Sequence, residues 1–162
     1  MITRFRLAIA LVIFGLIVSG ATAFPLLSEL NVLASLVTGG SSDLQPDHYS
    51  GFAHWILKVR EGLEVTYREY PFIGYGTDWL GFGHIVIALF FILPYRNPVR
   101  YRGVLHVGVV ACVLVVPLAM ICGEIRGIPF YWRLIDSSFG LLCIVPLLYA
   151  IRLSRQIERG GC

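Results

Sequence analysis

Long apolar runs, separated by short charged clusters, constrain this chain more than any other feature of its sequence. Each run is about 17–20 residues long, which is the length of helix that crosses the hydrocarbon core of a bilayer. Of the 162 residues, 57% are hydrophobic and 14% are charged, whereas about a quarter of the residues in an ordinary soluble domain are charged. The sequence therefore predicts an all-α integral membrane protein with one membrane domain over residues 1–162.

Four runs are predicted to span the membrane and to pack as a four-helix bundle. They cover about residues 7–24, 79–93, 104–122 and 134–151. The first run follows two arginines and ends in the small-residue sequence ATA (21–23), which is also the pattern of a cleaved signal peptide. We favour a retained helix, because the apolar stretch is long and more apolar sequence follows it. Pro25 marks a break, and the short apolar segment after it is expected to be a helical extension or an interfacial segment.

A segment before the second span, about residues 48–70, combines an apolar and a polar face at helical spacing. Its apolar face holds Phe52, Trp55, Ile56, Val59, Leu63 and Tyr67, and its polar face holds His54, Lys58, Glu61, Glu64 and Arg68. Such an amphipathic helix can lie in the membrane interface or cap the helix bundle. We expect it on the outer side of the membrane.

The distribution of basic residues predicts the orientation of the spans. More arginines and lysines flank the spans on the side that would hold both termini than on the opposite side, and basic residues favour the cytoplasmic side. Both termini are therefore expected in the cytoplasm.

Six ionisable residues are expected near the outer ends of the last three spans. They are Asp78, His84, Glu124, Arg126, Arg133 and Asp136. His84 shares a helical face with Gly81, and Asp136 shares one with Gly140, so both should face neighbouring helices, because close helix packing in lipid favours small residues. An ionisable side chain at membrane depth is unfavourable unless it is paired or hydrated, which makes it a candidate functional residue. We predict that these six residues form one outer cluster that binds a ligand or a partner.

Structural explanations of the same residues stay open. Asp78 can cap the second span, since a carboxylate favours the N-terminal end of a helix. Arg133 and Asp136 are three residues apart on one helix and can neutralise each other. Glu124 and Arg126 can form an interfacial ion pair, and His84 can be a packing residue.

Two longer patterns, YGTDWLGFGHIVIA (75–88) and IRGIPFYWRLID (125–136), resemble those of a family of small, uncharacterised four-span proteins of the bacterial inner membrane. The resemblance covers most of the chain. It implies a four-span protein with an amphipathic segment before the second span, and a location in the bacterial cytoplasmic membrane. It implies no activity, cofactor or catalytic residue.

Three functions compete. The first is a non-enzymatic membrane component that binds a partner or small ligand through the outer cluster, either with a protein partner or as a homo-oligomer. The second is a proton- or ion-linked transporter that acts as an oligomer, with His84 and Asp136 as a relay. The third is a membrane redox or haem protein, which the different expected depths of His84 and His106 disfavour.

No catalytic set is recognisable in the sequence. The four cysteines form no CxxC pair and the chain has no metal-ligand spacing. We therefore expect no catalytic residue, no metal site and no cofactor. The arginines lie beside membrane segments, so the net charge of +3 predicts contact with the lipid bilayer and no binding of nucleic acid.

Overall fold

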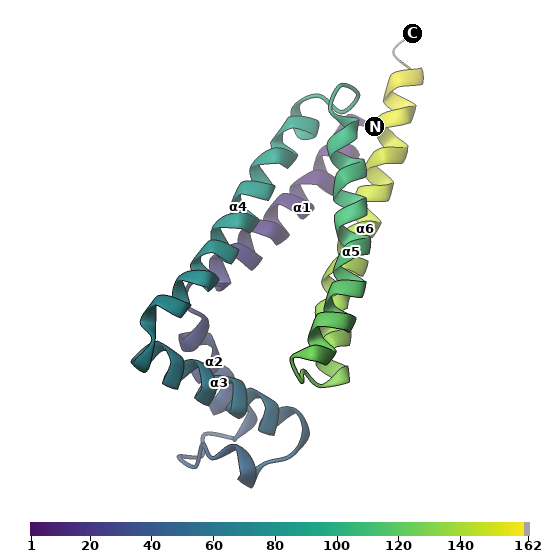
Figure 1. The fold of residues 1–162 in the computed structure, drawn as a ribbon. Helices are drawn as coiled ribbons and strands as arrows, with labels where there is room; N and C mark the ends of the chain where they lie inside the picture. The colour runs from purple at the N-terminus through teal and green to yellow at the C-terminus, as the bar shows by residue number, and fades with distance from the viewer. Residues whose placement is uncertain (161–162) are drawn as a thin grey trace. The chain divides into compact units, whose positions relative to one another are not determined.

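The computed structural model describes residues 1–160 and contains six α-helices, two short 3-10 helices and no strand in that range (Figure 1). The elements in chain order are α1 (Ile2–Thr22), α2 (Leu26–Val37), η1 (Pro46–His48), α3 (Gly51–Glu69), η2 (Pro71–Gly74), α4 (Tyr75–Arg96), α5 (Arg102–Ile125) and α6 (Phe130–Arg159).

Four of these helices are long and apolar enough to cross a membrane, namely α1, α4 with the preceding η2, α5 and α6. This confirms the prediction of an all-α chain with four candidate spans. The helices extend past the apolar runs, because the flanking residues also favour helix. The end of α6, for example, continues through the charged sequence RLSRQIER (152–159) to its last residue. Pro94, Pro117 and Pro146 lie inside α4, α5 and α6, which continue through them.

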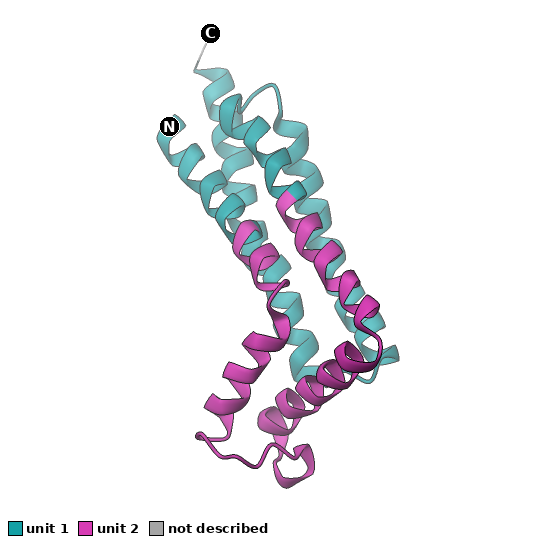
Figure 2. Cartoon of the chain, turned by 90° about the vertical axis from the view of Figure 1, so that its left-hand side faces the viewer, with its two compact units in different colours: residues 1–16, 86–162 teal, residues 17–85 magenta. Residues whose placement is uncertain are grey.

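The chain divides into two compact units (Figure 2). Unit 1 comprises residues 1–16 and 86–162, of which 161 and 162 lie outside the described part, and unit 2 comprises residues 17–85. The division falls inside α1 and α4, so each of these helices contributes one part to each unit.

Unit 1 has an apolar core to which α1, α4, α5 and α6 all contribute. Phe5, Leu105 and Leu147 are completely buried in it. The backbones of α5 and α6 approach closely at Gly140, where a Cβ atom would lie 2.5 Å from the carbonyl oxygen of Cys112. Small residues that allow close backbone approach favour helix association in lipid. Gly140 of α6 therefore packs closely against α5 at Cys112.

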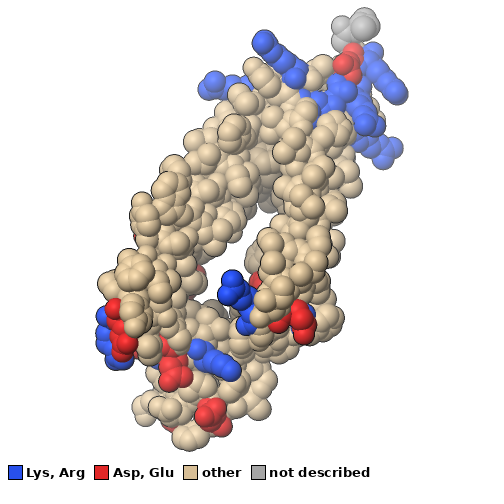
Figure 3. Space-filling model, viewed as in Figure 1, with Lys and Arg blue, Asp and Glu red and all other residues tan. Residues whose placement is uncertain are grey.

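A polar network ties the turn between α4 and α5 to the end of α6. The Nε atom of Arg102 donates to the hydroxyl of Ser154 over 2.9 Å, and this hydroxyl donates to the carbonyl oxygen of Pro98 over 2.8 Å. The Nη2 atom of Arg102 lies 2.5 Å from the Oε2 atom of Glu158. Other arginines gather at the same end of unit 1 and are exposed (Figure 3). They are Arg4, Arg6, Arg96, Arg100, Arg152, Arg155 and Arg159.

In unit 2, α2 packs against α3. Leu30 and Ala34 of α2 and Ile56 and Leu57 of α3 are buried. The Nε atom of Arg60 donates to the Oδ1 atom of residue 31 over 2.6 Å and links the two helices. The helix α3 begins three residues later than the predicted amphipathic segment, because residues 46–48 form η1 instead. Its interfacial position stays a prediction.

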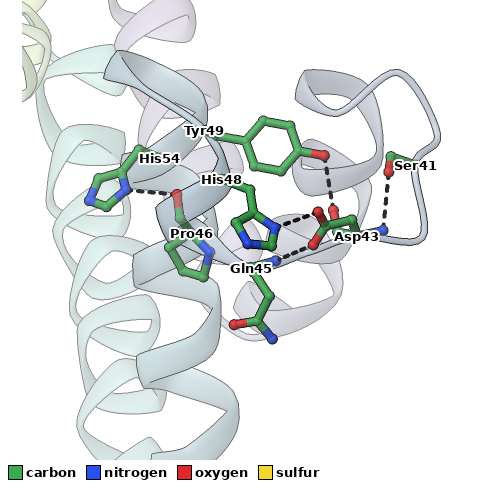
Figure 4. Close-up of polar contacts among 7 residues, drawn as sticks. All are labelled: Ser41, Asp43, Gln45, Pro46, His48, Tyr49 and His54. Atoms are coloured by element: carbon green, nitrogen blue, oxygen red, sulfur yellow. Dashed lines mark hydrogen bonds and ion pairs between the residues drawn. The ribbon is translucent and has the colours of Figure 1, made fainter.

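The connection between α2 and α3 is organised by Asp43 (Figure 4). Its Oδ1 atom accepts from the backbone amide of Gln45 over 3.1 Å, and its Oδ2 atom lies 2.6 Å from Nδ1 of His48. Tyr49 donates its hydroxyl to the backbone carbonyl of Asp43, and His54 donates from Nδ1 to the carbonyl of residue 46. The hydrogen bond from His48, with a smaller effect of the Gln45 amide, lowers the pKa of Asp43 below its ordinary value of 3.8.

Candidate functional site

The predicted cluster has its best-defined part where α5 turns into α6. The Nη1 atom of Arg133 forms an ion pair with the Oε2 atom of Glu124 and also donates to the carbonyl oxygen of Met120 over 3.3 Å. The side chain of Arg133 is only 13% exposed, whereas that of Glu124 is 71% exposed. The guanidinium group is therefore enclosed by protein, and the carboxylate faces outward.

Gly123 makes room for the Arg133 side chain. A Cβ atom at Gly123 would lie 2.6 Å from Cδ and 2.7 Å from Cγ of Arg133, which is closer than real Cβ contacts. The ring of Phe130 lies 5.4 Å from the guanidinium carbon and supports it by a cation–π contact. The Nε atom of Arg133 is buried and has no acceptor among residues 1–160. One donor of this guanidinium group is thus left without an acceptor among the described residues.

Asp136 lies about 9 Å along α6 from Phe130, at roughly 1.5 Å per residue, and is half-buried. The expected neutralisation by Arg133 does not form, because Arg133 pairs with Glu124. The neighbouring Ser137 donates its hydroxyl to the carbonyl of Arg133 over 2.8 Å and not to Asp136. Within the described residues no hydrogen bond or ion pair reaches the Asp136 carboxylate. It is an unpaired acid inside an apolar span.

Arg126 is the C-cap of α5, and its backbone amide donates to the carbonyl of Cys122. Its side chain is exposed and makes no ion pair within residues 1–160. The ion pair with Glu124 that the sequence allows does not form, since Glu124 is bound by Arg133. Arg126 therefore offers a free positive charge beside the Glu124–Arg133 pair.

His84 lies in unit 2, on the face of α4 that contacts α1. A Cβ atom added to Gly20 would be 2.7 Å from the carbonyl oxygen of Gly81 and 3.1 Å from Cβ of His84. The Nδ1 atom of His84 donates to the carbonyl of Leu80 over 2.8 Å. This bond places the proton of a neutral ring on Nδ1 and leaves Nε2 as an acceptor, for which the described residues supply no partner.

Asp78 lies in the first turn of α4, where the helix dipole favours a carboxylate as the sequence predicted, but it accepts no capping hydrogen bond. The helix begins at Tyr75, and no backbone amide of residues 1–160 donates to the Asp78 carboxylate. Asp78 instead lines a cavity of about 450 Å³ in unit 2. The other residues that line it are Phe24, Tyr67, Pro71, Gly74 and Tyr75. A second cavity, of about 550 Å³, is lined by residues of α5 between 111 and 122, all without charge.

Of the six predicted site residues, the structure brings Glu124 and Arg133 into direct contact. Arg126 and Asp136 lie on the same connection and helix of unit 1, while Asp78 and His84 belong to unit 2. That all six form one cluster stays a prediction. The sequence interpretation missed Gly123 and the aromatic lining around Asp78, although the aromatic-rich sequence YPFIGY (70–75) before Asp78 was a usable signal.

No group of three or more His, Cys, Asp or Glu residues in the described part of the chain is arranged to hold a metal ion. No protein-family model, no curated protein and no solved structure matches this chain. The functional interpretation therefore rests on the residues and their geometry.

Proposed function

We propose that this protein is a multi-pass, non-enzymatic component of the bacterial inner membrane that binds a partner or small ligand at its outer end. The proposed binding residues are Asp78, His84, Glu124, Arg126, Arg133 and Asp136. Both termini lie in the cytoplasm. The exposed arginines near the termini and at the α4–α5 turn support this orientation, since basic residues favour the cytoplasmic side.

The unpaired carboxylate of Asp136 carries this proposal. An ionisable residue within a span is unfavourable unless a partner or water compensates it, and such residues commonly serve function. The arginine that could compensate Asp136 is bound to Glu124. Asp136 is thus available to a cationic or hydrogen-bonding group, and Arg126, in the turn between α5 and α6, is available to an anionic group.

The proposal places α3 in the outer membrane interface. Its charged residues Lys58, Glu61 and Arg68 face away from Ile56 in the helical periodicity of the sequence, which suits a helix at a lipid–water boundary. In this arrangement α3 lies on the same side of the membrane as the turn between α5 and α6.

Photocrosslinking in cells tests this function. A photoreactive phenylalanine analogue is introduced at Arg126, which is exposed and makes no ion pair that the change would break. We expect a discrete adduct, either with one protein or with one small molecule, that the additional change Asp136→Asn weakens. The matched control carries the same analogue at Leu118, which is exposed on apolar α5, and should give lipid adducts only. Identical products at both positions would contradict the proposal.

Proton-linked transport by an oligomer is the second candidate function, and one observation favours it. The Nε2 atom of the half-buried His84 ring has no partner among residues 1–160, so it is available as a hydrogen-bond acceptor inside a span. Asp136 would be the second group of the relay.

A proton-flux assay in reconstituted vesicles separates this candidate from simple binding. His84→Ala should abolish flux if the relay operates. His106→Ala is the matched control, because the Nδ1 atom of His106 makes the same bond to the carbonyl four residues earlier while its ring is exposed. Equal flux for His84→Ala and the wild type would rule out the relay.

A further inference from the structure

The cavity beside Asp78 has the size and lining of a small-ligand site. Its volume of about 450 Å³ falls within the range of about 300–1,000 Å³ that is typical of such sites. Three of the six lining residues are aromatic, namely Phe24, Tyr67 and Tyr75, and one, Asp78, is acidic. All six belong to unit 2, so the cavity is complete within that unit.

The Tyr67 ring is fixed by hydrogen bonds and by a glycine. Its hydroxyl donates to the hydroxyl of Thr77 over 3.1 Å, since Thr77 donates its own proton to the carbonyl of Gly74 over 2.7 Å. A Cβ atom at Gly74 would lie 2.9 Å from Cε1 of Tyr67. The absence of a side chain at Gly74 therefore lets the ring lie flat against the turn that forms one wall of the cavity.

The other two rings are also supported. A Cβ atom at Gly81 would lie 2.8 Å from Cε2 of Phe24, so the Phe24 ring packs directly on the α4 backbone. Tyr75 contacts Trp79 edge to face, with ring centroids 5.9 Å apart. These contacts restrict the Tyr67 and Phe24 rings before any ligand binds, which reduces the entropy lost on binding, whereas Tyr75 is exposed.

Asp78 is exposed and gives the cavity a negative charge that no residue among 1–160 neutralises by an ion pair. It is the only charged residue in the lining. The α3 arginines are paired elsewhere: Arg60 with Glu64 at 3.0 Å and Arg68 with Glu69 at 3.6 Å. No ion pair or hydrogen bond to Asp78 occurs among residues 1–160. An occupant with a positive charge is therefore favoured over a neutral or negative one.

Aromatic faces beside a single carboxylate match one class of cation. The negative faces of aromatic rings attract ammonium groups, and quaternary and alkylated ammonium ions are recognised in this way. A bare divalent metal ion would need several oxygen ligands, and the lining has one carboxylate. We propose that this cavity binds the alkylammonium group of a small organic cation, either a free amine or the headgroup of a zwitterionic phospholipid.

This inference deepens the proposed function and rests on it, because Asp78 belongs to the predicted outer cluster. The cavity lies at the start of the α4 span. There α4 follows the charged helix α3 and the short uncharged turn η2. A lipid headgroup and a free amine would both reach this level of the membrane. The two sources share the ammonium group and differ in whether an acyl chain accompanies it.

Binding of tetramethylammonium to the full-length protein in detergent tests the cavity. Binding is measured by calorimetry and by the change in fluorescence of Trp79, which lies next to Tyr75. Sodium chloride at the same concentration controls for ionic strength. We expect saturable binding that Asp78→Asn weakens by about tenfold or more, the effect of losing roughly 1.4 kcal/mol of interaction. Tyr75→Leu should weaken it as well. Asp47→Asn, in η1 and outside the cavity lining, is the matched control and should bind tetramethylammonium as the wild type does.

Native mass spectrometry in nanodiscs distinguishes the two sources. If the ligand is a headgroup, the protein should retain phosphatidylethanolamine in preference to phosphatidylglycerol, and Asp78→Asn should abolish the preference. If it is a free amine, tetramethylammonium binds without any such preference. Binding no stronger than that of sodium, or unchanged binding by an Asp78→Asn variant with wild-type helical content, would overturn the inference. A crosslink at position 126 that persists in such a case would leave the proposed function standing.

Discussion

Arg133 of α6 forms an ion pair with Glu124 of α5 across the turn that joins the two helices. The choice of Glu124 over Asp136 on its own helix follows from Gly123, since the aliphatic part of Arg133 lies over the backbone of this glycine. As a result, Glu124 and Arg133 neutralise each other, and Asp136 and Arg126 keep their charges available. This separation of paired and unpaired charges underlies the proposed function.

The first prediction concerns Gly123. Gly123→Ala should push Arg133 out of its place and lower the free energy of unfolding by about 1–3 kcal/mol, the usual effect of overpacking. The measurement is unfolding in a mixed-detergent titration. Gly103→Ala is the matched control on the same helix, because a Cβ atom there meets nothing within 4 Å. Equal stability of the two variants would contradict the packing of Arg133 on Gly123.

A second pair of glycines tests the crossing of α1 and α4 around His84. Gly81→Ala should destabilise the protein by about 1–3 kcal/mol, because the new Cβ would lie 2.7 Å from the carbonyl oxygen of Gly20. Gly83→Ala, two residues away with no atom within 4 Å of its Cβ, should be neutral or stabilising by up to about 1 kcal/mol, since alanine favours helix over glycine. The opposite ranking would show that α1 and α4 do not meet at these residues.

A third prediction addresses the polar network between the α4–α5 turn and the end of α6. Ser154 is completely buried and joins Arg102 to the carbonyl of Pro98. Ser154→Ala should therefore reduce the free energy of unfolding by about 1–3 kcal/mol, the effect of leaving buried polar groups without partners. In the control Ser138→Ala, only a bond to the carbonyl of residue 135 on the same helix is lost. Thermal unfolding of both variants gives the comparison, and similar losses would argue against the network.

The fourth prediction is a pH dependence of the connection between α2 and α3. The lowered pKa of Asp43 means that its charged form is favoured in the folded loop. The resulting stabilisation is present above the ordinary value of 3.8 and is lost as the pH falls through the lower folded pKa. Since the hydrogen bond from His48 is the main cause, His48→Ala should raise the pKa of Asp43 towards 3.8.

Carbon NMR of the Asp43 carboxyl group follows this titration directly. His106→Ala removes a histidine from unit 1 and should leave the Asp43 titration unchanged. If His48→Ala left the midpoint where it is in the wild type, the hydrogen bond in Figure 4 would not be the cause of the shift.

The helices could be predicted from the sequence because a long apolar run in lipid must hydrogen-bond its backbone internally, which a helix does within a single segment. Their first residues were harder to predict. The second apolar run starts at Trp79, but α4 begins at Tyr75. The 3-10 helix η2 ends at Gly74, and α4 continues directly from it. This earlier start places Asp78 in the first turn of the helix, where the dipole still favours its charge, and not at the position that would cap the backbone amides.

The partners of the charged residues depend on tertiary contacts, which sequence spacing does not determine. Spacing allowed Arg133 to pair with Asp136 and Glu124 to pair with Arg126, and the turn between α5 and α6 selected the Glu124–Arg133 pair instead. The cavity beside Asp78 could not be predicted from the sequence either, because Phe24 lines it from a segment far away in the chain. Its aromatic residues appear in the sequence only as a local enrichment.

The most direct test of the central claim is a native mass spectrum of the protein extracted from its host in mild detergent, compared with that of Asp136→Asn. The account predicts a bound mass, from a partner chain or a small ligand, that the wild type carries and the variant loses. Asp47→Asn, a change in η1 outside the proposed site, should retain it. A wild-type protein that carries no added mass, or a mass that Asp136→Asn retains in full, would contradict the claim that the outer cluster is a binding site.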